Sequence, residues 1–423
     1  MQRLRLFATS GTKDGRTRLW AGSSLRSLRS PNFRRYYAGY MVSETGEWAQ
    51  RVGQAWLVLE LTGSGTWLGV VTGLQLLPVL VLAPWGGLLA DAADRRKLLL
   101  CTQSMNLLVA LLLAVTTQTG VVTVWVVIVL AVVTGSLKAV DHPTRQRFIL
   151  DMVGEDDLVN ALMLHSVLFN VAKVAGPAIS GLLVAVVGVS SSFYMNAASY
   201  VGVLVALAWI EPAALKSTTR QPRRHGQVRE AWRYVVATPE IAAPLVVLTV
   251  AGTVVFVWGV TIPILARDVF GGGPRTFGLM FSAMGLGAVV SGLGFAGRGA
   301  TSVRSFTTSG IALGGLVLCT STLPSLPLVL VALVLVGGAG TVFRSTGIGI
   351  VQLAADERLR GPVVGILGMA LLGTTPIGGP LVGLLAETVG IRWVLAGAGT
   401  GTVIAALLAA TWIKRCAPIE ALH

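Results

Sequence analysis

The sequence predicts an all-α integral membrane protein in which twelve transmembrane helices account for most of the chain. Hydrophobic residues make up 53% of its 423 residues and charged residues only 12%, a balance that is rare in a soluble domain of this length. The apolar residues gather in runs of roughly 20, the length of a helix that crosses a bilayer. These runs lie near residues 33–60, 66–90, 98–118, 121–147, 158–187, 191–210, 242–266, 276–297, 305–323, 326–352, 361–388 and 391–413.

Basic residues are distributed unevenly between the two ends of these helices. The N-terminal end, the even-numbered gaps and the C-terminal tail hold 26 lysines and arginines, whereas the odd-numbered gaps hold 3, namely Arg267, Arg275 and Arg392. Because lysine and arginine are held back from translocation, both termini and the even gaps are expected to be cytoplasmic. The formal charge of +14 then reflects basic loops that lie on anionic membrane lipids, and it argues against binding of nucleic acid.

The chain also repeats itself at an offset of 202 residues. A Gly-Leu-Leu sequence at 181–183, followed by Gly188, recurs at 383–385, followed by Gly390. This repeat predicts two six-helix halves with parallel topology. The expected organisation is a cytoplasmic N-terminal tail over 1–32, one half over 33–210, a cytoplasmic linker with an amphipathic segment over 211–240, the second half over 241–413 and a cytoplasmic tail over 414–423.

Two motifs lie in the first half of the chain. The segment between the second and third helices, residues 87–97, has a glycine, then aspartates, then a basic cluster. The fifth helix contains a glycine-proline pair and a further glycine, Gly176, Pro177 and Gly181. Both motifs resemble those of the major facilitator superfamily, and the second is typical of its exporters. The chain is similar to the enterobactin-exporter-like branch, also called transmembrane secretion effectors; the other segments that carry this likeness are 48–51, 141–145 and 359–361.

The resemblance implies a cytoplasmic gate, in which Asp91 caps a neighbouring helix or pairs with an arginine only while the two halves are closed together. An ordinary loop that follows the positive-inside rule is the alternative. Pro362 stands where the branch usually has a second arginine, and the second-half copy of the loop, at 292–304, lacks the aspartate, so the C-terminal side of the gate is expected to be weaker. The implied gate residues are Gly87, Asp91, Asp94, Arg95, Arg96 and Arg145. Arg145 and Asp141 lie on either side of Pro143 and form either a gate or a packing pair.

Charged residues also lie inside the predicted spans, where each costs several kcal/mol unless it faces protein or water. In the first helix, Glu44, Glu47 and Arg51 share one face. Glu47 and Arg51 have the favourable i, i+4 order, so Glu47 serves either as a neutralising partner or in transport. Glu44 is less clearly compensated, which makes it the better candidate for a carboxylate that gains and loses a proton.

Further intramembrane charges lie in the fourth, fifth and tenth helices. The resemblance implies that helices 1, 4, 7 and 10 line the substrate path, so charges on three of these four fall where a path is expected. A buried lysine at 173 requires a carboxylate, for which Glu44, Glu47 and Asp141 are candidates, whereas His165 is expected to be a packing histidine rather than a proton relay. The predicted coupling or cavity residues are Glu44, Glu47, Arg51, Lys138, Asp141, Lys173 and Arg344.

Motifs for other chemistry are missing from the sequence. It has no GxxxxGK[ST] loop, so an ion gradient is the expected energy source, and its three dispersed cysteines indicate neither a disulfide framework nor a metal site. We expect no cofactor and no enzyme activity. The seventh helix is almost wholly apolar apart from threonines and Trp258, which favours a large hydrophobic or aromatic substrate.

These observations predict a secondary active transporter in the inner membrane of a bacterial cell, and we expect it to be a monomer. The favoured function is proton-coupled export of small amphipathic compounds, such as drugs or a siderophore, by alternating access. Import or facilitated passage of a metabolite is one alternative, and a transporter-like sensor or assembly subunit is another.

The charge asymmetry makes the topology testable. A cysteine placed at Arg224 should react with a membrane-impermeant thiol reagent only after cells are opened, because the segment is expected to be cytoplasmic. A cysteine placed within 271–274 should react in intact cells. Labelling of position 224 in intact cells would overturn the topology.

Overall fold

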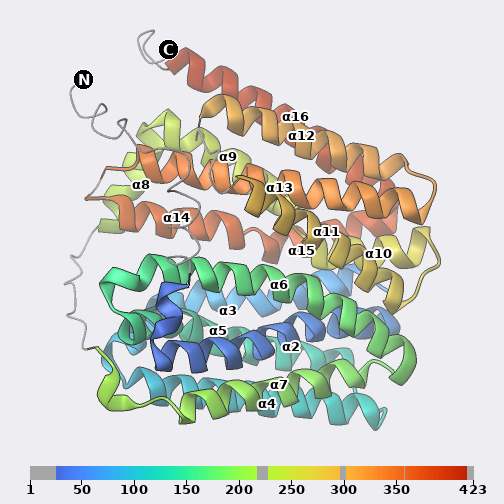
Figure 1. Ribbon diagram of the computed structural model, residues 1–423. Coiled ribbons are helices and arrows are strands. Elements are labelled where there is room, and N and C mark those ends of the chain that lie inside the picture. Colours follow the sequence, from blue (N-terminus) through green and yellow to red (C-terminus); the bar gives the residue numbers. More distant parts are fainter. Residues whose placement is uncertain (1–24, 217–226, 296–301, 357, 417–423) are drawn as a thin grey trace, which may run out of the picture.

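The computed structural model describes residues 25–216, 227–295, 302–356 and 358–416, which form helices joined by short turns (Figure 1). Most of the predicted N-terminal tail lies outside the described residues, as do positions 217–226 of the linker, 296–301 of the second-half loop copy and 417–423 of the C-terminal tail. The described part of the linker contains the predicted amphipathic segment as a helix, α8 (Gln227–Ala237), which buries Ala231 and Val235 and exposes Trp232.

Twelve crossings match the predicted runs to within about 4 residues, except that α5 continues six residues beyond the predicted end at 147. Eleven are long and apolar enough to span a membrane by length and composition alone, and α2, which carries the charged residues of the first run, is the twelfth. In chain order the crossings are α2 (Pro31–Thr62), α3 (Gly65–Ala92), α4 (Arg95–Gln118), α5 (Val124–Val153), α6 (Glu155–Val187), α7 (Ser190–Ala208), α9 (Pro239–Val254) with α10 (Trp258–Ile264) and the π-helical η3 (Leu265–Val269), α11 (Pro274–Phe295), α12 (Val303–Thr322), α13 (Leu326–Ala354), α14 (Arg360–Leu372) with α15 (Thr375–Val389), and α16 (Ile391–Cys416). Two short 3-10 turns are η1 (Arg26–Arg29) and η2 (Pro212–Ala214).

The helices form two six-crossing halves, with α2 to α7 in the lower part of Figure 1 and α9 to α16 in the upper part. We call the helix ends joined by the odd-numbered gaps, such as 62–65 and 269–274, the odd end, and the opposite ends the even end. The repeat is visible in the backbone, because Gly188 and Gly390 end the fifth and eleventh crossings with φ values of 104° and 89°. These angles suit glycine, which lacks the Cβ that would make them strained.

The most extensive contacts between the halves are made by two helix pairs, α3 with α15 and α6 with α11. Both are built on glycine. A Cβ at Gly69 would overlap the backbone of Gly379, and a Cβ at Gly278 would press on Pro177 and Gly181. Helices commonly associate through such close backbone contacts in a membrane. Lipid tails are as apolar as the helix surfaces, so association depends on close packing rather than on the hydrophobic effect. The same four helices therefore set the spacing between the halves.

Two crossings that were predicted as single runs are broken. The run at 242–266 is interrupted after α9, where the Phe256 amide donates to the carbonyl of Ala251, five residues earlier. The run at 361–388 is interrupted at 373–374, because Pro376 has no N–H with which to continue the hydrogen-bond ladder from α14 into α15. The breaks are adjacent, since a Cβ at Gly252 would contact Thr374. Discontinuous helices of this kind commonly flank substrate sites in transporters.

The packing between the halves predicts a difference between two glycines. Replacing Gly69 with alanine should lower the stability of the folded protein by about 1–3 kcal/mol, because the methyl group has no room against Gly379. Gly315→Ala on α12 is the matched control: its Cβ would meet open space, so it should be neutral or slightly stabilising. Thermal unfolding in detergent measures both, and equal melting temperatures would contradict this account of the interface.

Candidate transport site

The first helix and its neighbours in the N-terminal half form a network of buried charges. Glu47 on α2 accepts a hydrogen bond of 2.7 Å from the ammonium of Lys138 on α5 and one of 3.2 Å from the hydroxyl of Tyr200 on α7. Arg51 lies 4.0 Å from the same carboxylate. Lys138, rather than Arg51, is therefore the main partner of Glu47. The sequence did not predict this pair, because spacing along one helix indicates only partners on the same helix.

A second pair lies one turn further along α5. The Asp141 carboxylate accepts hydrogen bonds from Arg145 on the same helix and from Thr102 and Gln103 on α4, the latter two at 3.0 and 2.7 Å. Asp141 is 2% exposed and Arg145 6%, so the pair is removed from solvent. Such a pair is tolerated in a low-dielectric interior only when its remaining hydrogen-bonding capacity is used, as the two α4 side chains do here. Asp141 and Arg145 thus tie α5 to α4.

Glu44 is held differently from the other two carboxylates. It is 4% exposed, accepts a hydrogen bond from the Tyr40 hydroxyl, and lies 3.9 Å from Arg145, which is already bound to Asp141. The Arg145 guanidinium lies 4.1 Å above the centre of the Tyr40 ring, and the His165 ring stacks on that ring at 4.9 Å. Glu44 is therefore the carboxylate of this network without a cation at hydrogen-bond distance among the described residues.

The remaining predicted cations lie around Trp48. The Arg51 guanidinium is 4.1 Å from the centre of the Trp48 ring and the Lys173 ammonium is 6.0 Å from it, both within the range of cation–π attraction. The expectation that Lys173 pairs with Glu44, Glu47 or Asp141 is wrong for the described residues, where no carboxylate lies within ion-pair distance of it. Arg344 on α13 lies 5.3 Å from the ring centre of Phe256, at the break between α9 and α10.

The predicted gate residues lie together at the even end, with one exception. Asp91 pairs with Arg147 of α5 at 2.7 Å, and Arg95 makes two hydrogen bonds of 2.6 and 2.7 Å to Asp151. Both partners belong to the N-terminal half. Sequence reasoning assigned Arg145 to the gate, but its side chain points into the buried network, and Arg147, two residues later on the helix, pairs with Asp91 instead.

Other residues of the 87–97 motif organise helix ends. Asp94 caps α4 by accepting from the amides of Arg96 and Lys97 at 3.0 and 3.2 Å. Arg96 donates to the carbonyls of Leu207 and Ala208 at the end of α7, where the helix dipole favours a cation. Gly87 is buried on α3. This part of the motif therefore fixes the relative positions of three helix ends within one half.

The glycine-proline motif lies in the interface between the halves. Gly176 packs on α2, where a Cβ would press against Trp48, while the carbonyl of Pro177 and the backbone of Gly181 face Gly278 on α11. The Ser282 hydroxyl donates 2.9 Å to the Val174 carbonyl in the same contact. The motif thus brings α6 close to both α2 and the opposite half.

Comparison with known proteins identifies the family. Residues 22–421 match the family model for transmembrane secretion effectors, which covers nearly the whole chain. The chain belongs to this family, a branch of the major facilitator superfamily.

Relatives of known activity within this family are transporters. The chain is 27% identical to the staphyloferrin A transporter of Staphylococcus aureus, over 82% of this chain and 87% of the relative. It is 26% identical to the multidrug efflux pump Tap of Mycolicibacterium fortuitum, over 80% of this chain and 85% of the relative. A solved structure of a bacterial homologue of the human lysosomal transporter Spinster superposes with a TM-score of 0.68 at 15% identity, over 91% of this chain and 96% of that one, which shows the shared fold.

Among the described residues of this transmembrane secretion effector, the polar contacts that join the halves near their ends lie at the odd end. Glu387 at the end of α15 accepts hydrogen bonds from the hydroxyl of Ser64 at 2.6 Å and from the amide and hydroxyl of Thr66 at 3.0 and 2.8 Å. Arg267 donates 3.1 Å to the Gly63 carbonyl. A carboxylate at the N-terminus of α3 is favoured by the exposed amides and the helix dipole. Sequence reasoning missed this contact, because its partners are more than 320 residues apart.

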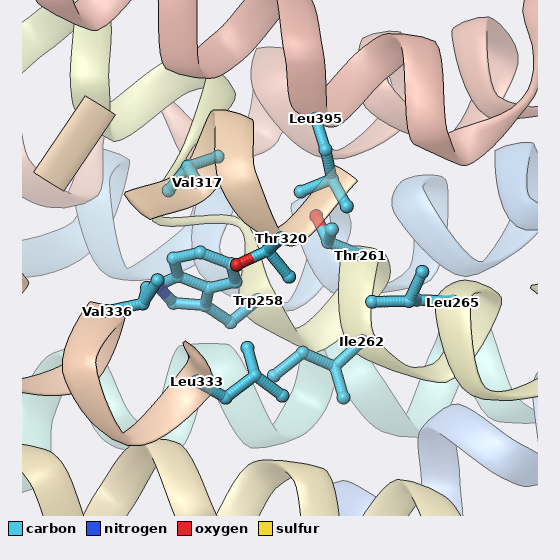
Figure 2. A pocket seen from close by; sticks show the side chains of 9 residues that line it. All are labelled: Trp258, Thr261, Ile262, Leu265, Val317, Thr320, Leu333, Val336 and Leu395. Carbon is cyan, nitrogen blue, oxygen red and sulfur yellow. The ribbon is translucent and has the colours of Figure 1, made fainter. Parts of the chain in front are cut away.

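A small apolar pocket lies within the C-terminal half and does not connect these sites. Trp258 and Thr261 line it together with residues of α12, α13 and α16 (Figure 2). The space admits no water molecule, so it is a packing gap. Its full lining is Trp258, Thr261, Ile262, Leu265, Val317, Thr320, Leu333, Val336 and Leu395.

The contact at the odd end predicts a shift in conformational equilibrium. Glu387→Ala should favour opening at this end by about 1 kcal/mol, a modest value because the contact is exposed to solvent. Glu60→Ala is the matched control, since Glu60 is also exposed near the odd end but accepts only from Trp56 of its own helix. Labelling of a cysteine at Ile264, which is buried and faces Gly65 of the opposite half, by an impermeant reagent measures the opening. Equal labelling rates in the two variants would contradict a closing role for Glu387.

Proposed function

We propose that this transporter is a proton-coupled exporter that carries small amphipathic compounds, such as drugs or a siderophore, by alternating access. The observation that carries the proposal is that three buried carboxylates in one half differ in their distance from the nearest cation. Glu47 and Asp141 each have a cation at hydrogen-bond distance, whereas Glu44 has a phenol and a more distant, shared arginine. Losing a proton at Glu44 therefore changes an electrostatic balance that the other two pairs hold fixed.

The coupling route follows from the contacts of Glu44. When protonated, this carboxyl group adds no charge beside Arg145, which stays with Asp141. When ionised, it competes with Asp141 for the same guanidinium across 3.9 Å. Arg145 also lies over the Tyr40 ring, on which His165 of α6 stacks. Because α6 packs on α11 of the opposite half, a change in this network can alter the contact between the halves.

Alternating access is supported by the arrangement of contacts at the two ends. Glu387 and Arg267 join the halves at the odd end, while the described ion pairs of Asp91 and Arg95 at the even end stay within the N-terminal half. We therefore assign closure of the odd end to Glu387 and Arg267. In the proposed cycle, Asp91 leaves Arg147 and pairs with a group of the opposite half when the even end closes.

The names of the relatives support export and leave the substrate open. One is a siderophore transporter and another is a multidrug efflux pump. Both are similar to this chain over more than three quarters of its length. The family match over residues 22–421 includes the charged first helix and the glycine-proline motif. Export of an amphipathic compound is the activity that fits both names.

Replacing Glu44 with glutamine tests the coupling. Glutamine mimics the protonated carboxyl and keeps a hydrogen-bond acceptor for Tyr40, so substrate binding and exchange down a gradient should persist. Uphill efflux driven by a proton gradient should fall at least about ten-fold, because one coupling step is removed. The measurement is dye efflux from liposomes that contain purified protein and carry an imposed pH gradient.

Glu47→Gln is the matched control. It removes the negative charge that neutralises Lys138 at 2.7 Å, so it should reduce the yield of folded protein rather than uncouple transport. Uphill transport at the wild-type rate in Glu44→Gln would eliminate Glu44 as the coupling residue. Wild-type protein that transports a substrate without any response to the pH gradient would eliminate proton coupling itself.

A further inference from the structure

Three cations lie deep within the membrane-spanning part of the molecule. Arg51, Lys173 and Arg344 are each ten or more residues from either end of α2, α6 and α13. At a rise of about 1.5 Å per residue, each lies at least about 15 Å along its helix from the nearer end. Ionised side chains at this depth are costly and face protein or a water-filled path rather than lipid.

The three cations lie on both sides of the boundary between the halves. Lys173 lies on α6 at this boundary, where a Cβ at Gly285 of α11 would contact the Lys173 carbonyl, and Arg344 belongs to the opposite half. The Trp48 ring, which contacts Arg51 and Lys173, also packs on Phe281 of α11 at 5.7 Å between centres. The cluster therefore lies where the two halves meet, and both arginines keep exposed surface there.

Among the described residues, Glu47 is the carboxylate that lies within ion-pair distance of this cluster. Glu47 lies 4.0 Å from Arg51 but is bound to Lys138 at 2.7 Å. Within the described residues, neither Lys173 nor Arg344 has a carboxylate at ion-pair distance. The sequence explains why for Arg344, which is the only charged residue between Arg304 and Asp356. Like charges held near one another repel, so an anion from outside the protein would stabilise this cluster.

Aromatic surface surrounds the same cations. Trp48 lies under Arg51, Phe256 lies under Arg344, and Phe169 packs on Trp48 at 5.6 Å between ring centres. The indole N–H of Trp48 makes no hydrogen bond to any described residue, which leaves a donor beside the cations. Cationic and aromatic groups combined in this way suit a ligand with both negative charge and a flat apolar part.

We propose that Arg51, Lys173 and Arg344 bind an organic anion that carries an apolar or aromatic group, and that this anion is the exported substrate. The proposal rests on the exporter function above and narrows its substrate class. It disfavours the cationic drugs that many efflux systems remove, because a cation in this position would meet three like charges. Since two cations belong to one half and one to the other, a bound anion also links the halves.

A pair of dyes with one ring system tests the charge preference. Fluorescein is anionic and rhodamine 123 cationic at neutral pH, and both contain a xanthene ring. Binding of each to purified full-length protein in detergent is followed by fluorescence polarisation. Wild type should bind fluorescein more tightly than rhodamine 123. Arg344→Gln should weaken fluorescein binding about ten-fold and leave rhodamine 123 binding equal or stronger.

Two further variants separate charge from folding. Arg344→Lys keeps the positive charge and should retain most of the fluorescein affinity. Arg304→Gln removes one positive charge at the exposed even end of α12 and should leave the affinity unchanged. Thermal unfolding of each variant verifies that the fold is intact.

The proposal would be overturned if wild type bound rhodamine 123 as tightly as fluorescein. It would also be overturned if wild type did not bind fluorescein, or if Arg344→Gln left fluorescein binding unchanged. The binding assay uses no proton gradient. Failure of gradient-driven efflux in liposomes would therefore refute the exporter proposal while leaving the anion preference measurable, and loss of the anion preference alone would leave proton-driven export intact.

Discussion

The cost of placing charge inside a membrane is the constraint on which this structure depends. A carboxylate or guanidinium in hydrocarbon must find a partner, and the N-terminal half provides partners from several helices. Glu47 joins α2 to α5 through Lys138 and to α7 through Tyr200, and Asp141 joins α5 to α4. Removing one member of either pair would leave a buried charge unpaired. The half is therefore held together by the same buried network to which we assign the proposed proton coupling.

The C-terminal half differs from the N-terminal half in its charges and in the continuity of its helices. It has few intramembrane charges, and its helices α9 and α14 end within the membrane-spanning region next to one another. One half supplies a rigid polar network, and the other supplies broken helices with Arg344 beside one break. The glycine contacts of α3 with α15 and of α6 with α11 bring the backbones of the two halves close together. Small residues permit close packing without side chains that interlock, which suits an interface that must change during transport.

Sequence reasoning predicted the fold well, because length and hydropathy determine where helices cross a bilayer and the repeat indicates two halves. It missed the interruptions inside two crossings, although Pro376 was a visible signal for one of them. It identified the charged residues of the site but not all of their partners. Spacing along one helix suggested Glu47 with Arg51, whereas the closest partner, Lys138, comes from another helix. Contacts between elements that are distant in sequence, such as Glu387 with Ser64, produce no local sequence pattern from which they could be predicted.

The incorrect expectation for Lys173 is the most informative of these differences. The expectation of a carboxylate partner rested on the rule that buried charges are paired, and the three available carboxylates are occupied by Lys138, Arg145 and Tyr40. The rule holds for a protein whose function is complete without a ligand. In a transporter, a charge left without a protein partner along the path is a place where the substrate can supply the counter-charge. The positive excess around Trp48 is then a property of the unloaded carrier, and neutralising it on binding provides free energy that can favour one arrangement of the halves over the other.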